Sequence, residues 1–330
     1  MDFVPPNPSP LLYVAKMSAS TKSATPQVIA AELIAVIVAV TGDAPRVLTL
    51  ENARALPSGP FQTVHRSLQA GLRQWVEQQT HHPLGYVEQL YTFADQDRTA
   101  TGVERRVISI SYLGLTREAR ARAGDTVSWQ SWYRYFPWED HRERGAIVIE
   151  RIAPFLRRWA DAADDAATRR DRRQRADITF GINGRVWIEE MVLQRYELLY
   201  EAELLPESSA FGIEASMPIP GEPMLHDHRR ILATALARLR AKIKYRPVVF
   251  ELMPPRFTLL QLQRMVEALA GRLLHKQNFR RLIDQQELVE ETGETTAETG
   301  GRPAKLFRFR REVQVERAIA GTKLPLSRDV

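Results

Sequence analysis

Three stretches near the C-terminus decide the fold of that part of the chain: FTLLQLQ at residues 257–263, HKQNFRR at 275–281 and GRPAKLFRF at 301–309. With Thr258 as a cap and Gly271 as a stop, the first predicts a helix over residues 259–269. The second predicts a helix over 276–285, and residues 288–291 and 305–309 predict a hairpin with a polar loop over 292–301. A helix, a turn, a helix and a hairpin follow one another in a winged helix, which places its second helix in a DNA major groove.

The second predicted helix carries side chains suited to reading base edges, because Asn and Gln pair with adenine and Arg with guanine. Its candidates for base contact are Lys276, Gln277, Asn278, Arg280 and Arg281. Phosphate or minor-groove contacts are expected from Thr258, which begins the first helix, and from Arg302, Lys305 and Arg308 of the hairpin. Phe279, Leu282 and Ile283 are expected to anchor the helix in the core. Ordinary solvated charges on a helical subdomain remain the alternative.

Charge is distributed unevenly along the 330 residues, whose net charge is +6. Residues 221–330 hold 21 Lys and Arg against 13 Asp and Glu, whereas residues 1–220 hold 25 against 27. A basic C-terminal third fits a module that binds a polyanion, although a merely basic surface would have the same composition.

Cysteine is absent from the chain, which excludes disulfides, thiolate metal sites and cysteine nucleophiles. The longest apolar run, residues 28–40, is interrupted by Glu32 and is too short to span a bilayer. Residues 1–26 are rich in Pro, Ser and Thr, which predicts a flexible tail without the pattern of a signal peptide. We therefore expect a cytoplasmic protein, associated with the nucleoid and not with a membrane.

The N-terminal part alternates strand and helix patterns and predicts an α+β domain with a mixed sheet. Strands are expected at residues 33–40, 46–50, 86–93 and 107–114, with a helix over residues 67–79 capped by Ser67. Residues 129–138 are rich in aromatic side chains, which suit adenine stacking, dimer packing or, more commonly, a core.

Residues 139–206 form an additional segment beyond this α+β domain. Residues 145–163 and 189–205 read as helices in this segment. Asn183-Gly184 between apolar runs predicts a hairpin.

The C-terminal segment resembles the winged helix of the Nudix-related transcriptional regulators of NAD metabolism, the NrtR family, over about residues 227–312. The likeness is carried by ILATALARLR at 231–240, FELMP at 250–254, NFRR at 278–281 and GRPAK at 301–305. It implies a Nudix-like ligand-sensing domain at 27–222, with a helical and hairpin insertion at about 139–206. A linker helix and a winged helix at 223–330 would follow. The insertion is similar to that of the NadQ-like branch.

The same resemblance implies a degenerate catalytic box. A Nudix hydrolase aligns glutamates along one helix to hold magnesium against a diphosphate. Here the loop LPSG at 56–59 matches, but the carboxylate positions hold Arg66, Trp75, Gln78 and Gln79, and Glu77 lies one residue out of register. An indole and amides do not supply the charge that magnesium requires, so the expected domain is not an enzyme. A plain structural helix remains the alternative.

The resemblance further implies a homodimeric repressor of NAD biosynthesis genes that binds a palindromic operator in double-stranded DNA. It would need no cofactor and would respond to an adenine nucleotide, namely NAD, ADP-ribose or ATP. The residues expected to bind this effector are Arg46, Arg73, Arg98, Arg106 and Trp132. Two competing hypotheses are an active Nudix pyrophosphatase with a DNA-binding tail, and an RNA-binding or architectural module without ligand control. The sequence does not decide whether the effector releases or promotes DNA binding.

Overall fold

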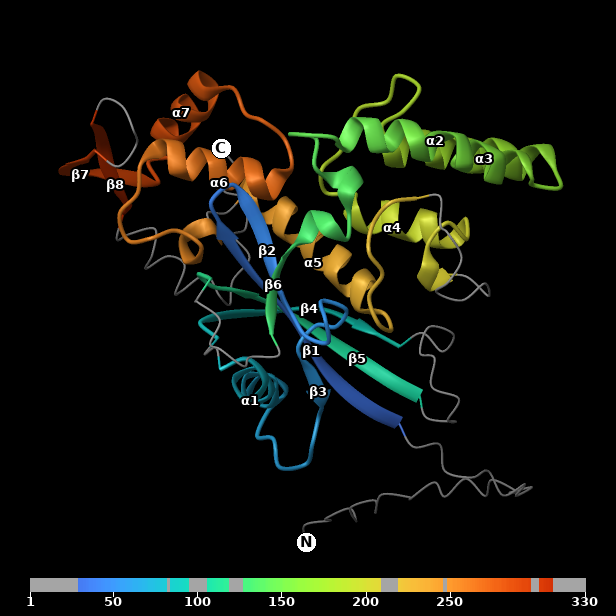
Figure 1. Ribbon diagram of the computed structural model, residues 1–330, viewed down its shortest axis with the longest axis horizontal. Helices are drawn as coiled ribbons and strands as arrows, with labels where there is room; N and C mark the ends of the chain where they lie inside the picture. Colours follow the sequence, from blue (N-terminus) through green and yellow to red (C-terminus); the bar gives the residue numbers. More distant parts are fainter. Residues whose placement is uncertain are drawn as a thin grey trace, which may run out of the picture.

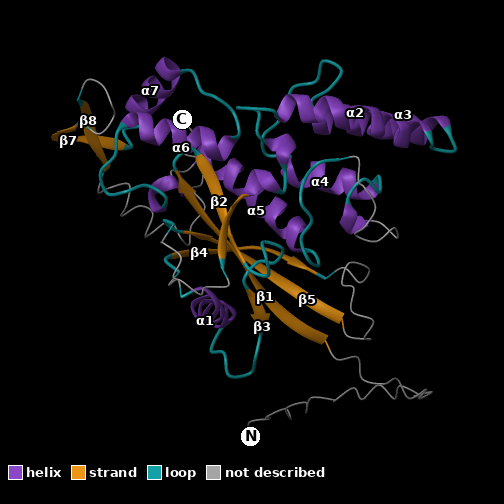
Figure 2. Cartoon of the chain, in the orientation of Figure 1, coloured by secondary structure: helices purple, strands orange, loops and turns teal. Residues whose placement is uncertain are grey.

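The structure is a computed structural model that describes residues 29–81, 84–94, 106–118, 127–208, 219–245, 248–297 and 303–310. A mixed sheet forms its centre, with a separate two-stranded sheet and two helices at one end (Figure 2). The predicted tail at 1–26 lies outside the described residues. Among those residues, no helix combines the length and apolarity needed to cross a membrane.

The central sheet has the strand order β4-β5-β1-β2-β6, with β3 paired to β1. Its strands are β1 (Ile29–Thr41), β2 (Ala44–Thr49), β3 (Ser58–Pro60), β4 (Tyr86–Phe93), β5 (Arg106–Leu115) and β6 (Ser128–Ser131). The β1–β5 pair is parallel and the other pairs are antiparallel, which confirms the predicted mixed sheet. Gly42 turns the chain between β1 and β2 with a positive φ of 61°, a conformation that glycine adopts without strain.

Alternate residues of β1 face opposite sides of the sheet, so each side has its own core. Leu33 and Ile37 pack on one side against Leu72 and Val76 of α1 (Leu68–Thr80). This helix begins as predicted, because the hydroxyl of Ser67 accepts a hydrogen bond from the amide of Ala70 at 3.1 Å.

The other side of the sheet is covered by α5 (His228–Tyr245), as Figure 1 shows. Leu232, Leu236 and Leu239 of α5 are completely buried in the larger core. The sequence suggested a linker helix here, and the structure adds that this helix is also the second layer over the sheet. The proposed boundary at residue 222 stays a prediction.

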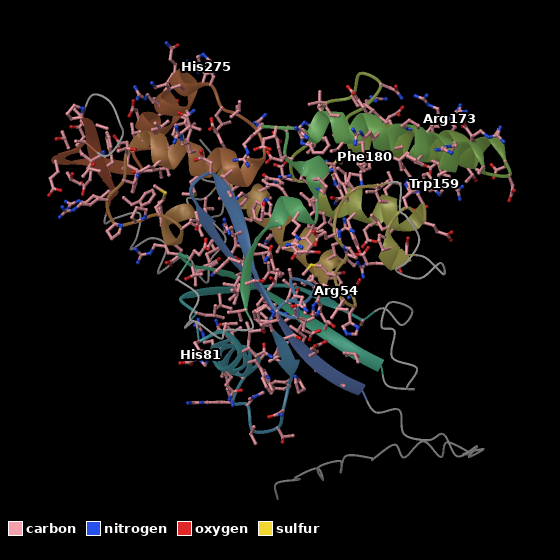
Figure 3. The ribbon with its side chains drawn as sticks, viewed as in Figure 1. Arg54, His81, Trp159, Arg173, Phe180 and His275 are labelled. Atoms are coloured by element: carbon pink, nitrogen blue, oxygen red, sulfur yellow. The ribbon has the colours of Figure 1, made fainter. Side chains whose placement is uncertain are left out.

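The segment between β6 and α5 adds three helices: α2 (Gly145–Asp161), α3 (Ala166–Phe180) and α4 (Val192–Glu201). Helices α2 and α3 pack side by side and extend from one edge of the molecule, where Figure 3 shows Trp159 and Arg173. Trp159 packs against the guanidinium group of Arg172, at 4.6 Å from the ring centre.

The hairpin predicted at Asn183-Gly184 is wrong. The first apolar run belongs to the last turns of α3, which ends at Gly181 in the left-handed conformation. Asn183 and Gly184 have positive φ values of 52° and 82°, as an Asn-Gly turn requires. Residues 127–208 nevertheless contain no strand after β6, so this turn leads from α3 into α4.

The C-terminal unit consists of α6 (Leu259–Ala270), α7 (Lys276–Gln285), β7 (Val289–Thr296) and β8 (Ala304–Phe309). Strands β7 and β8 pair in antiparallel fashion, and Phe257 bridges to Phe307 of β8. The predicted helix, turn, helix and hairpin are therefore present, with longer hairpin strands than expected.

Candidate nucleic-acid interface and effector site

The first helix of the C-terminal unit is fixed at both ends by local signals. The hydroxyl of Thr258 accepts a hydrogen bond from the Gln261 amide at 3.2 Å, and the Gln261 side chain accepts one from the Thr258 amide at 2.7 Å. Gly271 ends the helix with a φ of 73°. Since Thr258 is only 2% exposed and its hydroxyl serves the cap, a phosphate contact at this position falls to the neighbouring backbone amides.

The turn between α6 and α7 is held by two polar residues that the sequence did not single out. The carboxylate of Glu267 accepts hydrogen bonds from the Gln263 amide group at 2.9 Å and from the Leu274 backbone at 2.8 Å. Gln263 also donates to the Leu274 carbonyl at 3.0 Å. Both side chains are 8% exposed, so this bonding fixes where α7 begins.

Helix α7 presents its polar side outward, as predicted. Its exposed candidates are Lys276, Gln277, Asn278, Arg280 and Arg281. Phe279 and Ile283 are 6% and 7% exposed and anchor the opposite side. The anchoring role predicted for Leu282 is wrong: this side chain is 49% exposed, because it lies one residue before Ile283 and outside the buried stripe.

The cations of α7 are free to meet an anion. Within the described part of the chain, no ion pair joins Lys276, Arg280 or Arg281 to a carboxylate. His275, the residue before α7, lies at the outer edge of the molecule (Figure 3). A convex helix with an exposed basic and amide-bearing surface is the form that a major groove accepts.

The cations of the wing are paired with carboxylates on the neighbouring strand. Lys305 contacts Glu291 at 2.9 Å and Arg308 contacts Glu290 at 2.6 Å. All four side chains are exposed, so these pairs are weak enough to exchange for a phosphate. Arg302 lies outside the described residues, and its predicted role stays a prediction.

On the other domain, two side chains at the carboxylate positions of the Nudix pattern hydrogen-bond to the preceding loop. The indole of Trp75 donates to the Pro60 carbonyl at 3.0 Å. The Gln79 amide donates to the Ser58 carbonyl at 2.7 Å and accepts from the Ser58 amide at 3.2 Å. Trp75 also lies so close to Gly59 that an added Cβ would be 2.3 Å from its ring.

These residues do not fit a magnesium ion. The indole and the amide of Gln79 supply no negative charge and are engaged with the loop backbone, while the exposed Arg66 is cationic and the exposed Gln78 is uncharged. In the described ranges, no three His, Asp or Glu side chains gather closely enough to hold a metal ion.

The residues predicted to bind an effector are only partly brought together. Arg46 lies on the side of the sheet that α1 covers, where its Nη1 donates to the Trp129 carbonyl at 3.3 Å. Its Nε is buried, makes no hydrogen bond to the described chain, and lies 3.5 Å from a carboxylate oxygen of Glu118. Arg73 donates to the carbonyls of Leu84 and Gly85.

Arg73 also lines an open hollow of about 630 Å³ along α1, together with Ala70, Gln74, Glu77 and Gln78. Arg98 lies outside the described residues, and of Arg106 only the backbone at the start of β5 is described.

Trp132, proposed for adenine stacking, is completely buried. It begins η1 (Trp132–Arg134) and packs in the larger core with Tyr135, Phe136 and Trp138. These aromatic side chains therefore pack in the core, and in this structure the Trp132 ring is not accessible to a ligand.

A buried charged cluster at the meeting point of the domains escaped the sequence analysis. Glu139, at the end of η2 (Pro137–Glu139), contacts Arg195 of α4 and Arg240 of α5, each at 2.5 Å. All three side chains are at most 1% exposed. No local sequence signal joins the three residues, because the partners are 56 and 101 residues from Glu139.

Comparisons with known proteins agree with this organisation. Residues 249–309 match the family described as "NrtR DNA-binding winged helix domain". The "ADPR responsive transcriptional repressor NtrR" of Acinetobacter baylyi is 43% identical over 83 residues, which are 25% of this chain. The matching segment spans only 33% of that relative's own length.

Two crystal structures share the fold. The Shewanella oneidensis NrtR complexed with a 27mer DNA has a TM-score of 0.51 at 19% identity, over 86% of this chain and 95% of the other. A MutT/nudix family protein from Enterococcus faecalis has a TM-score of 0.51 at 16% identity, over 88% and 90%.

The predicted α+β class, with a Nudix-like domain before a winged helix, is thereby confirmed. Over residues 249–309 the chain is thus similar to the NrtR DNA-binding winged helix domain, and this unit follows a domain with the fold of a MutT/nudix family protein.

Proposed function

We propose that this chain is a transcriptional repressor whose winged helix binds an operator and whose Nudix-like domain binds a nucleotide without cleaving it. One observation carries the DNA-binding part. Helix α7 exposes three cations and two amides, while Phe279 and Ile283 hold its other side in the core. This arrangement joins electrostatic affinity for phosphate to the hydrogen-bonding groups that distinguish bases.

The proposal that the Nudix domain is inactive rests on the bonding of Trp75 and Gln79 described above. Their polar atoms hold the loop at Ser58 and Pro60. A diphosphate would therefore bind here through cations and amides in place of a magnesium ion. The relative from A. baylyi is named a repressor, which agrees with regulation in place of hydrolysis.

ADP-ribose is the effector that we propose, since the same relative is named as responsive to ADPR. Arg46 is a candidate for contact with its diphosphate, because its buried Nε makes no hydrogen bond to the described chain and lies 3.5 Å from Glu118. The hollow beside Arg73 and Gln78 is the surface that such a ligand would occupy. NAD and ATP contain the same adenylate group, so their binding is to be compared with that of ADP-ribose by titration.

We further propose that the protein acts as a homodimer on a palindromic operator, since two-fold symmetry would present two α7 helices to successive major grooves. Genes of NAD synthesis are the proposed targets, on the strength of the family resemblance. The effector alters DNA affinity by favouring a dimer geometry with one particular spacing between the two α7 helices.

The decisive experiment combines Arg280→Ala and Arg281→Ala in the full chain. Both side chains are exposed and unpaired within the described part, so the fold should survive. Specific operator binding in a gel-shift titration should be lost, while the urea midpoint stays unchanged. Arg170→Ala, an exposed arginine on α3, is the matched control and should bind as the wild type does.

Unchanged operator affinity in the double variant would refute the assigned reading surface. Magnesium-dependent turnover of ADP-ribose by the wild type would refute the inactive Nudix domain and restore the pyrophosphatase alternative. Sequence-independent binding that ignores all three nucleotides would favour an architectural module.

A further inference from the structure

The C-terminal end of α6 is bound by groups from outside the winged helix. The Tyr133 hydroxyl donates to the Ala268 carbonyl at 2.6 Å, the Arg240 Nε donates to the Leu269 carbonyl at 3.0 Å, and the His141 amide donates to the Gly271 carbonyl at 2.7 Å. The last carbonyls of a helix lack partners within the helix and carry its partial negative charge. Three of them are therefore satisfied by the Nudix-like side of the molecule.

Arg240 reaches this position because a carboxylate holds it there. Glu139 receives Arg240 on one oxygen and Arg195 on both, with Arg195 contacts at 2.5 and 2.9 Å. Burial alone would raise the pKa of Glu139, but the two guanidinium groups lower it, so the carboxylate stays ionised. The cluster thus joins α4, η2 and α5 at one point beneath the end of α6.

Gly271 allows the close approach. A Cβ built on it would lie 2.2 Å from the Glu139 carbonyl oxygen and 2.8 Å from the Arg240 guanidinium. Because backbone is the nearer obstacle, a larger residue at this position would push the end of α6 away. An outer contact, Arg272 to Glu189 at 2.7 Å, joins the next residue to the segment before α4.

The contacts continue in both directions from this point. Toward the sheet, α5 carries Lys242, which pairs with Glu88 of β4. Toward the DNA-reading surface, Glu267 lies on α6 and binds the Leu274 amide just before α7. A displacement of α5 relative to the sheet would therefore move α6 and the start of α7 together.

We propose that this joint, formed by Tyr133, His141, Arg240 and the Glu139 cluster around Gly271, is the coupling element that transmits effector binding to the winged helix. It rests on the proposed function, because it presumes that a nucleotide on the Nudix-like domain changes DNA affinity. Tyr133, Glu139 and Arg240 act as positioning residues and touch neither ligand. The segment that begins at η2 thereby gains a role, because it supplies Glu139, Arg195 and Glu189 to the joint.

The test is Gly271→Ala in the full chain, with Gly184→Ala as the matched control. Gly184 has a similar φ of 82° but nothing within 4 Å of its built Cβ, so it shares the backbone strain without the clash. DNA affinity is measured with and without ADP-ribose for each protein. Hydrogen exchange of the peptide containing His141 reports directly on undocking, because its amide bonds to Gly271.

For wild type and Gly184→Ala, the ratio of the DNA affinities measured with and without ADP-ribose should be the same. It should lie in the range of about 5- to 150-fold that is typical of allosteric coupling. Gly271→Ala should exchange faster at His141, still bind ADP-ribose, and show a ratio near one. Should that variant fail to fold, Tyr133→Phe removes a single hydrogen bond to α6 and should lower the ratio partially.

An undocked Gly271→Ala protein that keeps the wild-type ratio would overturn the joint while leaving the proposed function standing. Absence of operator binding, or of any response to nucleotide, in the wild type would overturn both.

Discussion

His228, the first residue of α5, should make the fold acid-sensitive. Its imidazole is 4% exposed, and its Nδ1 accepts a hydrogen bond from the Leu56 amide at 2.9 Å, which requires an unprotonated nitrogen. Burial, with a smaller contribution from His226, lowers the pKa of His228 from 6.5 to about 3. The side chain therefore joins α5 to the loop before β3 only in its neutral form.

The sign and size of the effect follow from linkage. Above pH 6.5 the group is neutral in both states, and below it the unfolded chain binds a proton that the folded chain does not. The contribution of His228 to the free energy of unfolding is therefore fully present above the pKa of the unfolded chain. It is lost as the pH falls toward the pKa of the folded protein. Between about pH 7 and about pH 5 the loss is about 2 kcal/mol, at 1.36 kcal/mol per pH unit. Because pH 5 lies well above the pKa of His228 in the folded protein, the size of this loss barely depends on that pKa.

Urea unfolding at the two pH values, with wild type and His228→Asn compared, measures this loss. The Asn Oδ1 replaces Nδ1 as the acceptor for Leu56 and does not titrate. The variant should lose about 2 kcal/mol less than the wild type over the interval, whatever its stability at neutral pH. Parallel pH profiles for the two proteins would refute the reasoning.

Three further changes probe other parts of the structure. Glu139→Gln should lower the free energy of unfolding by about 3–5 kcal/mol, because it leaves two buried guanidinium groups uncompensated; Glu294→Gln, at an exposed pair, should cost less than about 1 kcal/mol in the same urea titration. Thr258→Ala should cost about 1 kcal/mol through the lost cap of α6, and an unchanged midpoint would contradict the capping role. Gly59→Ala should displace the Trp75 ring, seen as a shift in tryptophan fluorescence, and an unaltered spectrum in a folded variant would contradict the contact.

Much of the fold could be predicted because its signals are local. The caps at Ser67 and Thr258, the stop at Gly271 and the apolar run of β1 each depend on residues close in sequence. The α7 surface was predictable for the same reason, although the buried stripe includes Ile283 and not Leu282. The caps and periodicity decide where elements begin and which side they bury.

The remainder depends on contacts between distant residues. Nothing near Glu139 in sequence announces Arg195 or Arg240, since the three meet only after α4 and α5 pack. Asn183-Gly184 does form a turn, but a hairpin also needs two strands, and the preceding residues had joined α3. For Trp132, the residue type alone did not distinguish a side chain that stacks on a ligand from one that packs in the core.

The loop held by Gln79 limits which side chains residue 79 can carry. Its amide gives a hydrogen to the Ser58 carbonyl, so a glutamate introduced there would set a negative oxygen against another oxygen. A glutamate at residue 79 would thus weaken the attachment of the loop around Ser58 before it could help to hold a metal ion.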